Sequence, residues 1–361
     1  MIDRGEWISP SARKAQQERE TTSVGQFVSD WHERQKQRLR LSTLQQYRRV
    51  IQNRITEPKA EAGSVLSRFA EMPLNELDTH AVYAWWDAMA TAFPETPETN
   101  RKAHVYLRAA MADAVERGLL DANPVAVKDA RHKPQPKTKE LPTTEDLLAV
   151  VNAAPKEHRL ALIFCLFLGM RIGEVLAVTR ENLRNVGTVA EPRWLVDVKG
   201  NLQRVQDEQG RTYMVWQEPK TKAGKRTVPV FERFNGAVEE HLKSYAPEEG
   251  DGYLFRTRTG KAIMDTSLRS ILERARDKSG VTSKITPHYG RNWLITHLAE
   301  NGATPAEIGQ LLGQTDLKTI TETYMKARPE NLNTIMGRVG NLLEPEAGVA
   351  SLADKRREKR A

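Results

Sequence analysis

The chain has 361 residues, which is long enough for two domains with separate hydrophobic cores. Its 55 lysines and arginines exceed its 47 aspartates and glutamates, and the formal net charge of +8 favours a polyanionic partner without identifying it. The single cysteine, Cys165, excludes a disulfide framework, and no apolar run approaches the ~20 residues that cross a bilayer. We therefore expect a cytoplasmic protein that has no membrane association and carries Cys165 in its core.

The first part of the chain predicts a small helical domain. Residues 1–20 are polar and show no periodic apolar face, so we expect a flexible segment. Apolar residues then recur at helical spacing, and Ser42-Thr43 stands where a cap of the second helix would be. Two more helices are predicted at about 80–92 and 98–117. Together these segments predict a helical domain over 21–127.

A basic segment follows the helical domain. Residues 128–142 are rich in lysine and arginine, contain Pro134 and Pro136, and lack a core-forming pattern. This composition predicts an extended linker between two domains. Such a linker can lie along a phosphate backbone.

The remaining residues predict a catalytic-sized domain over 143–340 and a C-terminal tail over 341–361. Alternation and β-branched residues between Trp194 and Val230 predict a small antiparallel sheet. Gly169 is placed to end one buried helix, and Arg171 opens the next. The other predicted helices cover about 144–152, 156–168, 231–244, 266–278, 286–302 and the residues after Thr304. The predicted fold class is mainly α with a small antiparallel β-sheet.

A constellation of polar residues in the second domain suggests phosphate chemistry. Arg171 stands at a predicted helix start, where free N–H groups favour an anion. His288 and Arg291 are spaced i and i+3, so we expect them to share one helix face. Two guanidiniums can grip one phosphate, and the hydroxyl of Tyr324 can attack it. Taken singly, each residue also fits a surface or core role.

Lys220 is the predicted proton donor of this constellation. It lies in a basic stretch, read as a hairpin, between Pro219 and Pro229. A mobile ammonium suits protonation of a leaving oxygen, although Lys222 and Lys225 compete for the role. All of these basic groups could instead solvate the turn or touch phosphates.

The motifs that carry these residues resemble those of the tyrosine recombinase family of phage and mobile-element integrases. The segment GMRIGEVL is similar to the motif of the first arginine, PHYGR to the His-x-x-Arg motif, and LLGQ with Tyr324 ten residues later to the nucleophile motif. The resemblance extends over about residues 22 to 340. It implies a helical core-binding (SAM-like) domain followed by an α+β catalytic domain.

The resemblance also assigns roles. Arg171 and Arg291 would hold the scissile phosphate, Lys220 would be the general acid, and His288 would assist proton transfer. Tyr324 would form a 3′-phosphotyrosyl link, without a metal or any other cofactor. Gln314 departs from the family, which usually has histidine or sometimes tryptophan there; an amide donates a hydrogen bond but carries no proton, so slower catalysis is expected.

The implied partner is double-stranded DNA at attachment and core sites. The two domains would clamp the duplex, and four protomers would exchange strands to integrate or excise a mobile element in a prokaryotic nucleoid. A directionality factor or a host bending protein would assist. We expect these residues to contact DNA, mainly at phosphates: Arg38, Arg40, Ser42, Thr43, Arg101, Lys102, Arg108, Lys133, Lys137, Lys222 and Lys225.

Three other functions belong to different classes of protein. A DNA-binding protein of the same fold that no longer cuts is favoured only by Gln314. A type IB topoisomerase-like enzyme shares the chemistry but not the motif spacings, and a metal nuclease is disfavoured because no compact carboxylate cluster is seen. Residues 2–7 resemble the stretch that follows a small arm-site DNA-binding domain in actinobacterial phage-type integrases, which indicates either a short form or a start further upstream.

Overall fold

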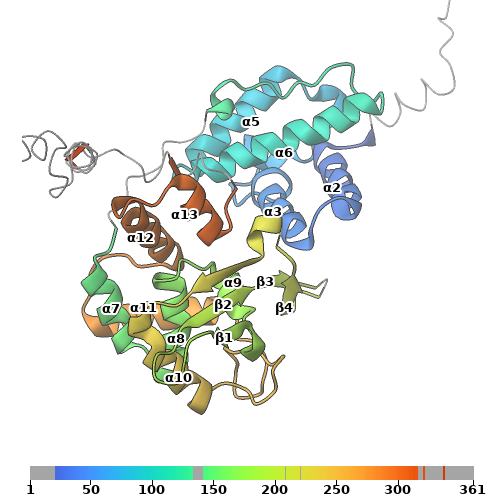
Figure 1. Ribbon diagram of the computed structural model, residues 1–361. Coiled ribbons are helices and arrows are strands. Elements are labelled where there is room, and N and C mark those ends of the chain that lie inside the picture. The colour runs from blue at the N-terminus through green and yellow to red at the C-terminus, as the bar shows by residue number, and fades with distance from the viewer. Residues whose placement is uncertain are drawn as a thin grey trace, which may run out of the picture. The chain divides into compact units, whose positions relative to one another are not determined.

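The computed structural model describes residues 21–132, 141–207, 209–219, 221–315, 320–321 and 336–337. Within them the chain is mainly helical and contains small antiparallel sheets, as predicted (Figure 1). The described residues form two compact units. The first contains 21–132 together with Arg204–Tyr213, and the second contains the remaining described residues.

The first unit is built from helices with clear local start signals. The side chains of Ser23, Ser64 and Asp78 each accept a hydrogen bond from a backbone N–H three residues further on, which satisfies a donor at the helix start. The predicted cap at Ser42-Thr43 is wrong, because Arg40 is the N-cap and both residues lie in the first turn. The helices are α2 (Val24–Arg34), α3 (Leu41–Ile51), α4 (Val65–Phe69), α5 (Thr79–Ala92) and α6 (Pro97–Glu116), with a π-turn η2 (Gln52–Thr56) and a 3₁₀ turn η4 (Asp129–Arg131).

The core of the first unit contains a buried arginine. Arg54 lies in η2, donates to Asn100 Oδ1 and Thr96 Oγ1 at 2.9 Å each, and places its guanidinium 3.7 Å from the ring centre of Phe93. These contacts tie η2 to the start of α6, beside the stacked rings of Phe69 and Trp85. Burying the charge with neutral acceptors and an aromatic face offsets part of its desolvation.

The first residues of the predicted linker belong to the first unit. Residues 129–131 form η4, and the side chains of Val127 and Ala130 are buried in the core of the first unit. Apolar residues this small give little periodic signal in a basic stretch, which explains the error. Residues 133–140 lie outside the described part of the chain.

His104 gives the first unit a pH dependence. Its side chain in α6 is buried against Trp86, and burial, together with the charges of Arg108, Arg131 and Arg101, lowers its pKa from 6.5 to about 4. Below pH 6.5 the unfolded chain takes up this proton before the folded chain does, so stability falls as the pH drops towards 4. At ~1.4 kcal/mol per pKa unit, we expect a loss of roughly 3 kcal/mol.

Urea unfolding of wild type and His104→Leu between pH 7 and 4 measures this contribution. The difference in unfolding free energy between the two proteins should change with pH by that amount and level off below pH 4. Parallel pH profiles would contradict the assignment. Carboxylates that titrate in both proteins contribute equally to the two unfolding free energies, so their contribution cancels in the difference.

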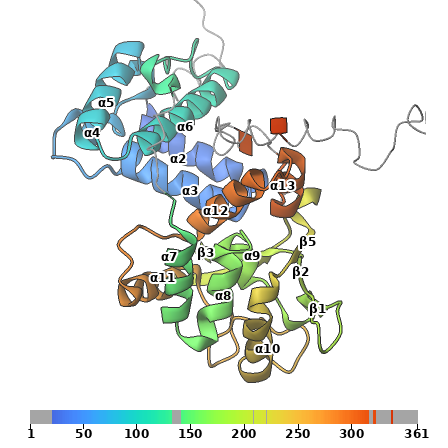
Figure 2. The ribbon, with the colours of Figure 1, turned by 60° about the vertical axis from the view of Figure 1, so that its left-hand side comes forward.

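The second unit contains seven of the described α-helices. Its helices are α7 (Thr144–Ala153), α8 (Lys156–Leu166), α9 (Ile172–Leu176), α10 (Asn235–Ser244), α11 (Asp265–Ser279), α12 (Pro287–Glu300) and α13 (Pro305–Leu312). Helix α12 packs along α8 and α11 along α7 (Figure 2). The side chains from Leu160 to Leu168 are all buried, including Cys165, and burial raises the pKa of that thiol to about 12. No described helix is long and apolar enough to cross a membrane.

The predicted single sheet is in fact two. Strands β1 (Leu183–Asn185), β2 (Trp194–Val198) and β5 (Arg226–Pro229) form an antiparallel sheet in the order β1-β2-β5, and β3 (Asn201–Gln206) pairs with β4 (Thr212–Gln217). The basic stretch before β5 therefore joins strands of different sheets and is not the tip of a simple hairpin. Alternation reveals strands but not their partners, so the sequence could not separate these sheets.

Two glycines allow the close packing that positions the second unit's polar site. Gly169 ends the buried helix region with φ of 61°, as predicted. Gly290 lies in the first turns of α12 directly against α8, where a Cβ atom would come within 2.3 Å of Leu166 Cα. Only glycine permits this approach, which fixes the neighbouring Arg291 relative to the core.

Candidate active site

The polar site lies in the second unit. Four of the six predicted site residues, Arg171, His288, Arg291 and Gln314, are described, whereas Lys220 and Tyr324 lie outside the described residues. Arg171 directly precedes α9, and His288 and Arg291 lie in α12. Gln314 follows Gly313 at the end of α13.

Arg171 stands at the start of α9, as predicted. It is the N-cap residue, with extended φ and ψ angles of −69° and 146°. Its backbone N–H donates to Glu174 Oε2 at 2.9 Å, and its Nη1 donates to Glu174 Oε1 at 2.8 Å. The side chain remains 48% exposed, so part of the guanidinium faces solvent. An exposed arginine at a helix start can bind an anion.

Glu174 pairs with two basic neighbours, Arg171 and Arg226 of β5. Arg226 Nη2 lies 2.8 Å from Glu174 Oε2, and both side chains are more than nine-tenths buried. Burial opposes ionisation of Glu174, but the hydrogen bonds and charges of Arg226 and Arg171 outweigh it and hold the pKa of this carboxyl below its usual range. The carboxylate is therefore ionised at neutral pH and orients Arg171.

Arg291 is buried, which rules out the alternative of a solvated surface arginine. It is 4% exposed, and its guanidinium donates to Gly169 O at 3.0 Å and to Leu312 O at 2.9 Å. A third bond from Nη2 reaches Gln314 Oε1 at 3.0 Å. These bonds connect α12 with the turn before Arg171 and with the end of α13.

Gln314 is held by the end of α13. Gly313 adopts the left-handed conformation, and the backbone N–H of Gln314 donates to Gly309 O at 2.8 Å, which closes the helix in a Schellman-type turn. Because the side-chain Oε1 accepts from Arg291, the Nε2 amide group is the part of Gln314 able to donate to a ligand.

His288 and Arg291 differ in solvent exposure, although their spacing predicts a shared helix face. His288 lies in the first turn of α12 and is exposed, whereas Arg291 one turn later is buried. Residues three positions apart on a helix are neighbours, but their side chains do not point in the same direction. The side of α12 that carries Arg291 packs against α8 and is therefore buried.

Arg226 is the site residue that the sequence analysis missed. Its place in the basic stretch predicts a solvated side chain, but Arg226 lies in β5 with its side chain 5% exposed. The alternation of side chains along a strand indicates this burial, because Arg226 lies on the same side of the extended segment as the buried Val228 and Val230.

Lys222 is the first residue of a short 3₁₀ turn, η6 (Lys222–Gly224), Lys225 follows that turn, and both are exposed. Lys225 Nζ lies 3.0 Å from Glu218 Oε1. The two predicted contacts Lys133 and Lys137 lie outside the described residues. Within the described ranges no group of three or more His, Cys, Asp or Glu side chains could hold a metal ion.

The predicted DNA contacts of the first unit lie around α3 and α6. Arg38 and Arg40 precede α3 and are exposed. Arg101 forms a two-bond pair with Glu98, and Arg108 donates to the carbonyl of Val125. Ser42, Thr43 and Lys102 are partly exposed.

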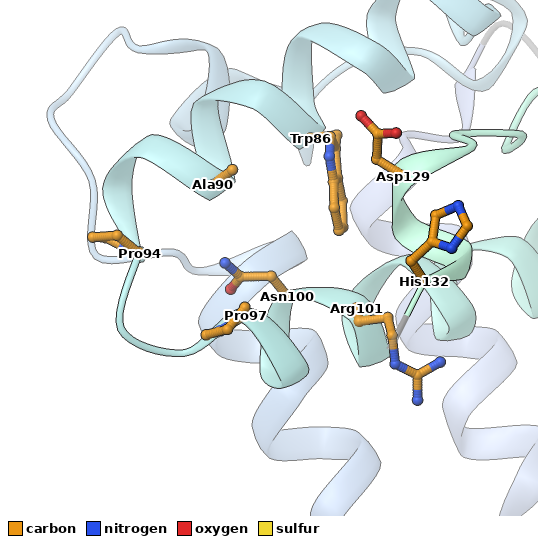
Figure 3. A pocket seen from close by; sticks show the side chains of 8 residues that line it. All are labelled: Trp86, Ala90, Pro94, Pro97, Asn100, Arg101, Asp129 and His132. Carbon is orange, nitrogen blue, oxygen red and sulfur yellow. The ribbon is translucent and has the colours of Figure 1, made fainter. Parts of the chain in front are cut away.

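Arg101 also borders a pocket of the first unit. The pocket has a volume of about 370 Å³ and lies between α5, the start of α6 and η4 (Figure 3). Trp86 and His132 line it together with Arg101, and apolar surface predominates. This pocket contains none of the residues that the sequence analysis assigned to catalysis.

Comparisons with known proteins identify relatives of this chain. Residues 141–331 match the model of the phage integrase family. The chain is 27% identical over 320 residues to a prophage phiRv2 integrase of Mycobacterium tuberculosis, covering 86% of this chain and 76% of that protein.

Two solved structures share the fold. The Tn1549 transposon integrase in complex with circular intermediate DNA has a TM-score of 0.69 at 18% identity, covering 88% of this chain and 100% of that one. A lambda integrase tetramer bound to a Holliday junction has a TM-score of 0.56 at 14% identity, covering 88% and 82%.

Proposed function

Because the chain belongs to the phage integrase family of tyrosine recombinases, we propose that it is a site-specific recombinase that integrates and excises a mobile element. It would cleave and rejoin duplex DNA through a 3′-phosphotyrosyl link. The observation that carries the proposal is that Glu174 holds Arg171 at the start of α9, while Arg291 of α12 bonds to Gln314 at the end of α13 and to the carbonyl of Gly169, two residues before Arg171. In the proposed site, two guanidiniums and one amide would donate to the oxygens of the scissile phosphate.

In the proposed reaction, the hydroxyl oxygen of Tyr324 attacks the phosphorus atom and the bond from phosphorus to the 5′ oxygen breaks. Lys220 gives a proton to the leaving 5′ oxygen, and His288 assists removal of the tyrosine proton. The phosphotyrosyl ester conserves the energy of the phosphodiester, so the reverse attack by a 5′ hydroxyl restores the strand without a cofactor.

Arg171 and Arg291 stabilise the charge that develops on the non-bridging oxygens. Their hydrogen bonds within the protein fix their direction before DNA binds, so little reorganisation is needed during reaction. The amide of Gln314 adds a neutral donor, where a histidine would add a group able to carry charge. Metal ions have no required role in this scheme.

We further propose that core-site DNA and three other copies of this chain are its partners. The solved relatives bound to transposon DNA and to a Holliday junction support this assignment. In the first unit, the exposed Arg38, Arg40 and Arg108 are the proposed phosphate contacts, with salt-dependent affinity. A directionality factor or a host bending protein would bias integration against excision.

A second candidate is a DNA-binding protein of the same fold that occupies sites without cutting them. Gln314 is the observation that favours it, because the amide cannot titrate. The Arg171–Glu174–Arg226 contacts favour the enzyme, because they orient a half-exposed arginine at a helix start, where a phosphate would bind.

Covalent trapping separates the two candidates. A suicide DNA substrate that carries the attachment site should yield a protein–DNA adduct on a denaturing gel with the wild-type chain. Tyr324→Phe should abolish the adduct, because its ring has no nucleophilic oxygen, whereas Tyr289→Phe, at a buried tyrosine of α12, should retain it. Absence of an adduct on DNA that the protein demonstrably binds would favour the non-cutting candidate.

A further inference from the structure

Arg226 connects three segments of the second unit that carry proposed catalytic groups. Its Nε donates to Leu311 O at 2.7 Å, in the last turn of α13. Its Nη2 bonds to Glu174 Oε2 at 2.8 Å, and its Nη1 lies 3.3 Å from Gly224 O in the turn before β5. One planar guanidinium thus reaches α9, α13 and the basic turn.

We propose that Arg226 is a positioning residue that sets the direction of Arg171 and Gln314 for strand cleavage, an inference that rests on the proposed function. Arg226 itself is 5% exposed and is not a proposed contact of DNA. It acts on Arg171 through Glu174 and on Gln314 through the end of α13.

The carboxylate of Glu174 is shared between two arginines. Oε1 accepts from Arg171 Nη1 at 2.8 Å and from Arg226 Nη1 at 3.3 Å, and Oε2 accepts from Arg226 Nη2 and from the backbone N–H of Arg171. These four bonds satisfy the acceptor capacity of a carboxylate. Arg226 donates two of the four bonds. Glu174 therefore orients Arg171 through one guanidinium nitrogen and leaves the rest of that guanidinium without a bond to the carboxylate.

The three ionised groups together carry one net positive charge. Without Arg226, the buried carboxylate would have Arg171 as its remaining charged partner among these contacts, and their attraction would oppose binding of a phosphate to Arg171. Arg226 therefore leaves the exposed part of Arg171 available to substrate.

The contact with α13 is equally specific. Arg226 binds the carbonyl of Leu311, while Arg291 binds the carbonyl of Leu312, so two guanidiniums hold consecutive C-terminal carbonyls of one helix. Gly313 lies against the same group, since a Cβ there would be 2.9 Å from Arg226 Nη1. Lysine has one compact donor group and cannot make this contact and the paired contact with Glu174 together.

Hydrogen–deuterium exchange of the DNA-free chain tests the positioning directly. Arg226→Met should increase exchange at the backbone amides of Arg171 and Gln314, whose bonds to Glu174 and Gly309 depend on this junction. Arg184→Met is the matched control, because Arg184 also makes a two-bond pair with a carboxylate, Asp197, but is exposed. Unchanged exchange at both amides in Arg226→Met would overturn the proposal.

Single-turnover cleavage of the suicide substrate tests the consequence. We expect Arg226→Met to be 10–100-fold slower while its affinity for the same DNA changes less than threefold, and Arg226→Lys to be intermediate. Adding Glu174→Gln to Arg226→Met should recover at least threefold in rate, because the unbalanced carboxylate is removed. An unchanged rate, or a double variant slower than Arg226→Met, would overturn the positioning role.

The two experiments separate this inference from the proposed function. If the wild-type chain forms no adduct on bound DNA, the proposed function fails, and the exchange measurement still decides whether Arg226 fixes the two segments. If the wild-type chain cleaves and Arg226→Met cleaves equally fast, the inference fails alone. Thermal unfolding of each variant excludes global loss of the fold.

Discussion

Arg291→Ala should lower the rate of single-turnover cleavage at least a thousandfold. An arginine that stabilises the charge of a phosphoryl-transfer transition state is typically worth roughly 10³–10⁵ in rate. Alanine also leaves the carbonyls of Gly169 and Leu312 and the Oε1 of Gln314 without this donor. The loss should appear in the cleavage step on saturating DNA, measured as covalent adduct formed with time.

Two further variants interpret that loss. Arg291→Lys retains the charge but lacks a planar group with bonds in several directions, so we expect it to recover only a small part of the rate. Arg274→Ala, which removes an exposed arginine of α11, should cleave like the wild type. A decrease of less than tenfold in Arg291→Ala would contradict the role assigned to this residue.

Gly290→Ala should have the largest effect on the stability of the second unit. The added Cβ would lie 2.3 Å from Leu166 Cα and 2.6 Å from Leu166 O, and backbone atoms of a buried helix cannot move aside as a flexible side chain can. Overpacking usually costs 1–3 kcal/mol, and contact with backbone places this case at about 3 kcal/mol or above.

Alkylation of Cys165 provides the measurement, because it is the chain's single cysteine and is fully buried beside Gly290. A loss of about 3 kcal/mol should raise the labelling rate of the native protein roughly a hundredfold, provided that labelling follows opening of the core. Gly236→Ala is the control, since nothing lies within 4 Å of that Cβ in α10. Equal labelling rates for both variants would contradict the packing explanation.

Most helices of this chain could be predicted because their signals are local. Pro287 and Pro305 stand in the first turn of α12 and α13, and Thr304 and Glu307 form a capping box. Gly169 and Gly302 have the positive φ that a helix end requires. Family motifs indicate Arg171, Arg291 and Gln314, and the structure bonds Arg291 to Gln314 and to the carbonyl of Gly169, two residues before Arg171.

The contacts between distant segments could not be predicted in the same way. Arg226 and Glu174 are 52 positions apart, and nothing local shows that a basic side chain after a polar turn enters the core. The pairing of β2 with β5, which passes over the intervening β3 and β4, could not be predicted for the same reason. The choice of a strand's partner depends on tertiary packing. Burial of Arg291 likewise requires the close contact of Gly290 with α8.

The burial of the Glu174–Arg226 pair determines how the protein responds to ionic strength. Counterions weaken interactions among exposed charges, including those between surface arginines and a DNA backbone, but they reach a pair that is more than nine-tenths buried much less. Concentrated salt should therefore release DNA while the arginine contacts around α9 and α13 stay intact. Protein eluted at high salt and returned to low salt would then regain DNA binding without having to rebuild its catalytic pocket.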